Sequence, residues 1–111
     1  MTASTSTQNA PAWDVLEQAL TNQQAVRVRY GGHDRTICPH VLGWKNNQPK
    51  VLAYQIDGAT SHGPLPTDPT RRWRAMLIND IHDAVIVDGA WQTGPNYTPM
   101  TNNIDHVALH C

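Results

Sequence analysis

Arginine is the residue type with the clearest chemistry in this sequence of 111 residues, where six of the eight basic side chains are guanidinium groups. A guanidinium presents a planar fork of donors that matches a phosphate or a carboxylate. Two segments, one with Arg27 and Arg29 and one with Arg72 and Arg74, alternate with apolar residues and are each predicted to be a strand with one basic face, and Arg35 begins a third predicted strand. If the two strands are neighbours, these faces form one anion-binding patch; the alternative is a pair of solvated faces on a half-exposed sheet. The arginines are Arg27, Arg29, Arg35, Arg71, Arg72 and Arg74.

Aromatic and histidine side chains complete the predicted binding site. Tyr54 and Trp73 could stack on a base while the arginines hold its phosphate. His40, which follows Pro39, is predicted to form structural hydrogen bonds or to line the pocket. The predicted ligand is a nucleotide, single-stranded nucleic acid or another small anion. The predicted ligand-binding residues are Arg29, Arg35, His40, Tyr54, Arg72, Trp73 and Arg74.

Neither a metal centre nor a catalytic centre is predicted. The six histidines and two cysteines show no CxxC, HxH or HExxH spacing. His106 and His110 would share one face of a helix, which is a weak signal so close to the end of the chain. Cys38 is predicted to be a small buried hydrophobic residue. No nucleophile elbow, phosphate-binding glycine loop or pair of catalytic acids is legible, so we expect a non-enzymatic protein without a cofactor.

The overall composition predicts one soluble globular domain. Hydrophobic residues make up 40% of the sequence and charged residues 15%, with a net charge of −1 and a pI of about 6.6. This balance gives no global attraction to nucleic acid or to an anionic membrane, so any such binding must use a local patch. We find no leader and no apolar run near the roughly 20 residues of a membrane helix, and we expect a cytoplasmic protein that does not bind membranes.

The elements that must position these residues are one helix and five short strands. Residues 1–11 are uncharged and lack an apolar period, which predicts a disordered tail. Apolar residues at helical spacing predict a helix from about Trp13 to Asn22. Strands are then predicted over 26–30, 35–44, 50–56, 71–78 and 83–87, with a tight hairpin turn at 31–32 and a second turn at 46–49.

Three further features bear on the organisation of the chain. Pro39 is predicted to lie at an edge, a bulge or a bend, because proline cannot donate to a sheet ladder. The segment 57–70 is rich in glycine and proline and is predicted to be a long loop that is functional or disordered. The domain is predicted to span 12–97, followed by an extension over 98–111 that packs on the domain or is mobile.

Several short pieces of the sequence follow one another in a characteristic order. They are Ala19-Leu20, Val28-Arg29-Tyr30-Gly31-Gly32, Arg35, Cys38-Pro39-His40-Val41-Leu42-Gly43, Leu52-Ala53-Tyr54-Gln55, Asp57-Gly58, Trp73-Arg74 and the segment 91–97. In order and spacing these pieces resemble the WYL domain family, and most closely its short stand-alone bacterial members. The Trp-Tyr-Leu triplet itself is absent, and Leu77 and Asp80 stand where the family carries basic residues.

The resemblance implies a mainly β (α+β) fold, namely an SH3-like or Sm-like small five-stranded barrel with an N-terminal helix. It also implies a module that senses a ligand or nucleic acid and regulates a neighbouring helix-turn-helix or enzyme. A second hypothesis, favoured by the near-neutral charge, is a protein-interaction module such as a phage or bacterial inhibitor of a defence or transcription enzyme. A homodimer is expected in either case, because short barrels with open edge strands often pair.

Overall fold

The described chain begins with the predicted helix. The computed structural model describes residues 12–61, 63–87, 91–97 and 103–111, so the predicted tail at 1–11 lies outside the described residues. Helix α2 spans Ala12–Asn22 and buries Leu16, Ala19 and Leu20, which lie on one face at the spacing of helical turns. The helix prediction is therefore confirmed.

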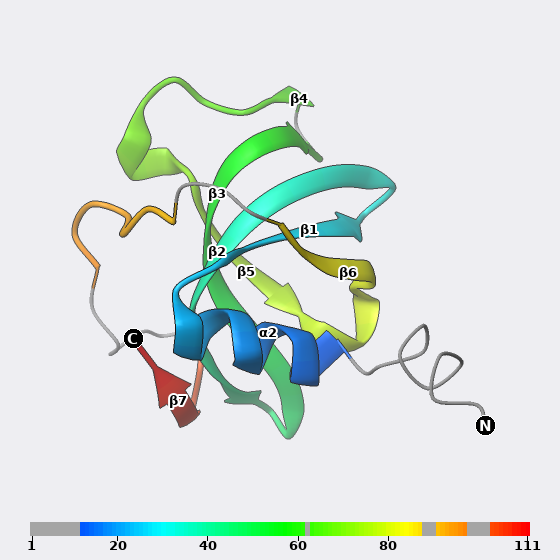
Figure 1. The fold of residues 1–111 in the computed structure, drawn as a ribbon, viewed down its shortest axis with the longest axis vertical. Helices are drawn as coiled ribbons and strands as arrows, with labels where there is room; N and C mark the ends of the chain where they lie inside the picture. Colours follow the sequence, from blue (N-terminus) through cyan, green and yellow to red (C-terminus); the bar gives the residue numbers. More distant parts are fainter. Residues whose placement is uncertain (1–11, 62, 88–90, 98–102) are drawn as a thin grey trace.

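Seven strands follow the helix in the described residues and form one antiparallel, open sheet (Figure 1). Its central order is β4-β3-β2-β1-β6, while β5 also pairs with β3 and β7 also pairs with β2. The strands are β1 Ala25–Tyr30, β2 His33–Lys45, β3 Gln48–Thr60, β4 Gly63–Pro64, β5 Trp73–Leu77, β6 His82–Val87 and β7 His106–His110, with short 3-10 helices η1 Pro69–Arg71 and η2 Ile78–Asp80. The prediction of a mainly β fold with one N-terminal helix is confirmed, but the described strands number seven rather than five.

Two tight turns join the long strands. Tyr30 pairs with His33 across Gly31 and Gly32, both of which have positive φ, as the predicted hairpin turn requires. The turn between β2 and β3 is shorter than predicted, because Asn46 and Asn47 alone form it and both also have positive φ. Asparagine tolerates this left-handed region better than most residues, which explains the tight connection.

Two predicted irregular segments contain strands. The predicted loop at 57–70 is wrong in its first part, because β3 continues to Thr60 and then pairs with β4. In the C-terminal extension, β7 pairs with β2, so His106 and His110 lie on a strand and not on a helical face. The part of the extension over 98–102 lies outside the described residues.

A bulge in β2 occurs where Pro39 predicts one. Pro39 pairs with Ala53 and Val41 pairs with Leu52, so His40 is the extra residue between them. On the other edge of β2, β1 pairs as far as Ile37 and β7 begins at Val41. Pro39 therefore falls in the gap between these two strands, where its missing N–H breaks no ladder.

Both faces of the sheet are covered in the described chain. Residues that pair directly in an antiparallel sheet point to the same side. We call inner face the side of the sheet that packs under Leu16 and Leu20 of α2; its core residues are Val26, Val28, Ile37, Leu42, Val51, Ala53 and Met76. The outer face packs against the segment 91–97 and Ile104; its buried residues are Cys38, Val41, Leu52 and Tyr54. In Figure 1, α2 crosses in front of the lower part of the sheet, and the chain from β4 to η1 arches over the upper end.

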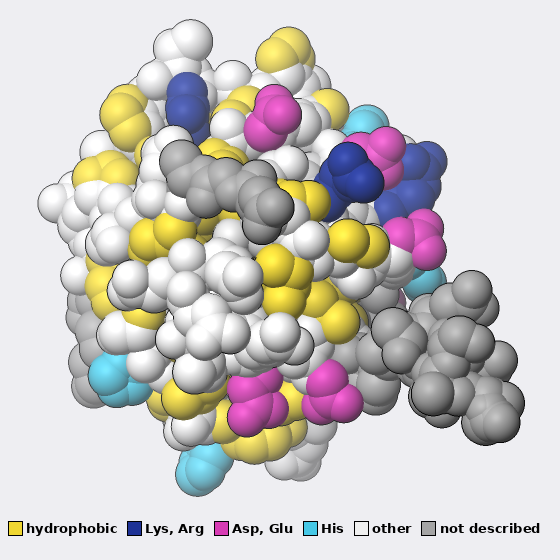
Figure 2. All heavy atoms as spheres, viewed as in Figure 1, with side chains coloured by type: hydrophobic (Ala, Val, Ile, Leu, Met, Phe, Trp, Pro, Cys, Tyr) yellow, Lys and Arg dark blue, Asp and Glu magenta, His cyan; other side chains and the backbone are white. Residues whose placement is uncertain are grey.

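Charged side chains are mixed on the face that carries α2. Figure 2 shows basic and acidic groups next to one another at the right-hand side of this view and no extended basic surface on this face. In the described chain, none of the helices is both long enough and apolar enough to cross a membrane.

Candidate functional site

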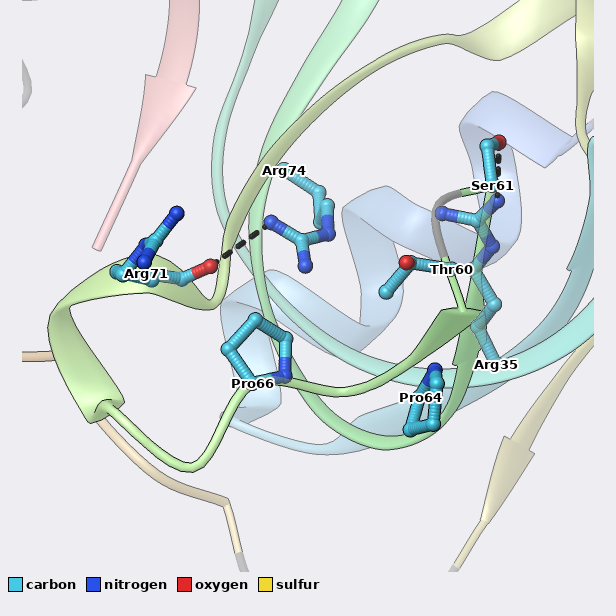
Figure 3. Close-up of a pocket in the computed structure, with 7 residues that line it drawn as sticks. All are labelled: Arg35, Thr60, Ser61, Pro64, Pro66, Arg71 and Arg74. Carbon is cyan, nitrogen blue, oxygen red and sulfur yellow. Dashed lines mark hydrogen bonds between the residues drawn. The ribbon is translucent and has the colours of Figure 1, made fainter.

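The candidate site is an open cleft of about 520 Å³ beneath the chain that connects β4 to β5 (Figure 3). Its described lining contains three guanidinium groups, two hydroxyl groups and two prolines, but no carboxylate. In Figure 3, Arg71 and Arg74 lie on one side and Arg35 and Ser61 on the other, with Thr60 between them. The lining residues are Arg35, Thr60, Ser61, Pro64, Pro66, Arg71 and Arg74.

A bend in β3 brings its end close to β2 at this cleft. Gly58 has a φ of +96, and a Cβ atom there would collide with the carbonyl oxygen of Asp34 on β2. Buried Gln55 braces the bend, because its Nε2 donates to the carbonyl oxygens of Asp57 and Ala59 at 3.0 Å each. Only glycine permits both the conformation and the close approach, so the sequence Asp57-Gly58 sets the path of the strand at this point.

Local hydrogen bonds hold the segment 66–71, which forms one wall of the cleft. Asp68 caps η1 by accepting from the hydroxyl of Thr70 at 2.8 Å and from its backbone N–H at 3.0 Å, and these two hydrogen bonds, the hydroxyl's first, lower the pKa of Asp68. Arg72 donates from Nε to the carbonyl oxygen of Pro66 at 2.7 Å. Arg74 donates from Nη1 to the carbonyl oxygen of Arg71 at 3.0 Å. The segment that carries Pro66 and Arg71 is thus tied to the start of β5.

Arg35 is the most unusual member of the site. It is only 4% exposed, and its pairing with Val28 places it on the inner face. Its Nη2 donates to Ser61 Oγ at 3.3 Å and its guanidinium lies 5.2 Å from the centre of the Tyr30 ring, but its buried Nε has no hydrogen-bond partner. Burial, as the larger effect, lowers the pKa of the Arg35 guanidinium, and the charge interaction with Tyr30 opposes it.

No carboxylate of the described chain neutralises Arg35. The ion pairs among the described residues are Arg29–Asp34 at 3.0 Å and Lys45–Asp105 at 3.1 Å. Asp34 is the sequence neighbour of Arg35, yet it points to the opposite side of β2 and pairs with Arg29. Removing a guanidinium group from water without an anionic partner costs several kcal/mol of folding free energy.

Arg74 and Arg71 bring further positive charge to the same cleft. Arg74 pairs with Ala53 across β3 and β5, so it also projects from the inner face. The pKa of Arg74 is lowered first by burial and then by repulsion from the charge of Arg35. Arg71 is exposed, and its guanidinium makes no hydrogen bond to another described residue. The three arginines therefore form a concentrated positive site in a chain whose net charge is −1.

The prediction that the arginines form one anion-binding patch is only partly correct. Arg35, Arg71 and Arg74 meet in the cleft, but Arg27 and Arg29 line a separate hollow with Asp34 and Asp83. Arg29, a predicted ligand-binding residue, is held there by Asp34 and by the carbonyl oxygen of Gly32. Arg72, also predicted, braces the wall through Pro66 and is not among the described lining residues.

The predicted aromatic residues lie on the outer face, away from the arginines. Tyr54 is 3% exposed and its ring contacts the edge of Trp73, whose Nε1 donates to the carbonyl oxygen of Pro95. A buried ring has no free face, so the predicted stacking of a base on Tyr54 is wrong. Trp73 is half-buried and stacks on Tyr97. Tyr54 and Trp73 thus anchor the segment 91–97 to the sheet.

His40 is also a structural residue of this outer-face cluster. It is fully buried and stacks on Trp91 with ring centroids 4.7 Å apart. Its Nδ1 lies 2.7 Å from the carbonyl oxygen of Cys38, to which it donates, and its Nε2 accepts from the N–H of Gly94 at 3.4 Å. This pattern is that of the neutral ring, and burial lowers the pKa of His40. Its predicted structural role fits, whereas its place among the ligand-binding residues does not.

Other reactive groups do not form a site in the described chain. Cys38 is buried, and burial raises the pKa of its thiol, which keeps it protonated. No group of three or more histidine, cysteine or acidic side chains in the described ranges could hold a metal ion. The lining residues Thr60, Ser61, Pro64 and Pro66 were missed as individual residues, although all four fall in the segment 57–70 that the sequence marks as a functional or disordered loop.

Comparisons of the chain with protein-family models, with curated proteins and with solved structures found no match in any of the three.

Proposed function

We propose that this protein is a non-enzymatic binding module whose arginine cleft, formed by Arg35, Arg71 and Arg74, takes a small anionic ligand such as a nucleotide. The observation that carries the proposal is Arg35, a 4% exposed guanidinium that lines an open cleft and has no carboxylate partner among the described residues. Burying a charge costs several kcal/mol unless a counter-charge and hydrogen bonds compensate it. An anion in the cleft would supply the counter-charge.

We also propose that the module is of the WYL type, with strands arranged as in an SH3-like or Sm-like barrel. The support is the order of elements, a helix followed by tightly connected antiparallel strands, together with the sequence pieces from Ala19 to Tyr97. In this proposal, ligand binding in the cleft regulates a partner protein. In Figure 1 the chain that covers the cleft lies at the opposite end of the sheet from α2.

Thermal unfolding in the presence of different anions tests the binding proposal. At constant ionic strength, phosphate should raise the unfolding temperature more than chloride, because a ligand at a hundred times its Kd stabilises the folded state by about 2.7 kcal/mol. The effect should be lost in Arg71→Gln and Arg74→Gln and kept in Arg27→Gln, an exposed control outside the cleft. Native mass spectrometry of the purified protein would show whether a small anion is retained.

The same data can reject the proposal. If phosphate stabilises Arg74→Gln as much as the original protein, the cleft does not bind it. If chloride and phosphate act equally on the original protein and no anion is retained, the cleft binds neither anion and the function lies elsewhere.

A second candidate function, protein interaction, is favoured by two exposed apolar residues on edge strands. Val85 is 50% exposed on β6 and Val107 is 39% exposed on β7. Among the described strands, β6 pairs with β1 alone and β7 with β2 alone, so each offers an unpaired edge. Such edges add strands from a partner or from a second copy. Light scattering of the original protein and of Val85→Lys and Val107→Lys separates a homodimer, which the substitutions should dissociate, from a monomer.

A further inference from the structure

The charge of the cleft bears on the class of anion. Three guanidinium groups line it, and its described lining holds no carboxylate. A singly charged group would leave most of this positive charge uncompensated, whereas a phosphate monoester carries about −1.5 to −2 charges at neutral pH and three strong acceptor oxygens. The charge balance therefore favours a terminal phosphate over a diester.

The donors around the cleft also suit a compact group with several oxygens. The guanidinium of Arg71 has no hydrogen-bond partner among the described residues, and Arg35 and Ser61 also line the cleft. Ser61 accepts from Arg35 through its oxygen, which leaves its hydroxyl proton to donate. These donors come from β2, from η1 and from the residue that follows β3, and they lie on opposite sides of the cleft (Figure 3). A group with several acceptor oxygens could accept hydrogen bonds from more than one side of the cleft.

A polynucleotide backbone would need features that this surface does not show. Single-stranded nucleic acid is bound by a groove of positive charge that follows several phosphates, with aromatic rings that stack on the bases. Here Arg29 is paired with Asp34 and Lys45 with Asp105. The described lining of the cleft contains no aromatic residue. Figure 2 likewise shows no basic track on the face that carries α2.

We propose that the arginine cleft recognises a phosphomonoester dianion at the end of a small molecule, and not the diester backbone of a nucleic acid. The inference rests on the proposed anion-binding function and narrows it to one ligand class. Pro64 and Pro66 would pack against the organic part of the ligand, and Arg35 would take the innermost oxygen because it is the most buried of the three arginines.

Isothermal titration calorimetry with matched probes tests this inference. The probes are inorganic phosphate, AMP, cyclic AMP and an unphosphorylated oligonucleotide of about ten nucleotides. AMP and cyclic AMP share a base, but AMP presents a phosphate monoester and cyclic AMP a diester. The ratio of their dissociation constants therefore measures the effect of the second negative charge. We expect AMP to bind at least about tenfold more tightly than cyclic AMP, the effect of about one lost charge-assisted hydrogen bond. Binding of AMP should weaken below the second pKa of its phosphate, about 6.

Variants make the outcomes distinguishable. Arg71→Gln and Arg74→Gln should each weaken the binding of AMP at least about tenfold. Ser61→Ala should weaken AMP binding less, and Arg27→Gln should leave it unchanged. If cyclic AMP or the oligonucleotide binds as tightly as AMP and the cleft variants abolish that binding, the monoester inference is overturned while the anion-binding function stands. If no probe binds, inorganic phosphate included, or if the cleft variants do not change the binding, both the monoester inference and the anion-binding function are contradicted.

Discussion

Replacement of Arg35 by methionine tests whether the buried guanidinium lacks a partner within the fold. Methionine keeps a long unbranched chain but removes the charge. Replacing buried ion pairs by apolar residues of similar volume is neutral or stabilises a protein by about 1–4 kcal/mol, and we expect a comparable gain for a buried charge that has no ionic partner. Against this, the variant loses the hydrogen bond to Ser61, about 1 kcal/mol, and the contact with the Tyr30 ring, about 0.5–1 kcal/mol.

The balance predicts that ligand-free Arg35→Met is more stable than the original protein by about 1 kcal/mol, the middle of these ranges. Urea denaturation followed by tryptophan fluorescence measures the change, since the chain holds four tryptophans. The matched control is Arg27→Met, whose exposed side chain should change the stability by less than about 0.5 kcal/mol. A loss of more than about 1 kcal/mol in Arg35→Met would refute the reasoning, because the charge would then be compensated inside the fold.

Three further predictions concern the outer-face cluster and the bend. Because buried His40 has a pKa below its ordinary 6.5, the unfolded chain binds a proton at a higher pH than the folded protein. The free energy of unfolding should therefore fall as the pH drops below about 6.5, by at most about 1.4 kcal/mol per pH unit. Urea titrations across this range should show that His40→Gln reduces this dependence of the unfolding free energy on pH. Gly94→Val should destabilise the protein by about 1–3 kcal/mol in urea, because even a Cβ atom at Gly94 would lie 2.5 Å from both the Trp73 and Tyr54 rings. Gly58→Ala should lower the thermal unfolding temperature and weaken phosphate binding together, since a Cβ at this positive φ collides with Asp34 and displaces the wall of the cleft.

Local signals in the sequence predict much of the fold. The apolar spacing of Leu16 and Leu20 gives the helix, and Gly31-Gly32 gives the first hairpin, because each signal acts within a few residues. Gly58 misled the prediction, since glycine next to several prolines is typical of a loop, whereas here it bends a continuing strand. Strand β7 was missed because it is mostly exposed and is ordered by its pairing with β2 rather than by burial.

The candidate site was harder to predict because both faces of the sheet are covered. Alternation along β5 separates Trp73 from Arg74, but it does not say which side faces the core under α2. Here Arg74 lies on that inner side, at the open end of the sheet, and Trp73 lies under the segment 91–97. The positions of Arg35 and Arg71 beside Arg74 depend on strand register and on the path of residues 63–71, neither of which follows from spacing alone.

The most direct test of the anion-binding cleft is a titration of the nitrogen-15-labelled protein with inorganic phosphate at constant ionic strength, with detection of the arginine Nε–Hε signals by NMR. We predict that the signals of Arg35 and Arg74 shift together and saturate, because an anion in the cleft would place negative charge beside both guanidinium groups. The signal of exposed Arg27 should stay in place. Equal and unsaturated shifts of all three signals, or no shift of Arg35, would contradict the assignment of this cleft as the binding site.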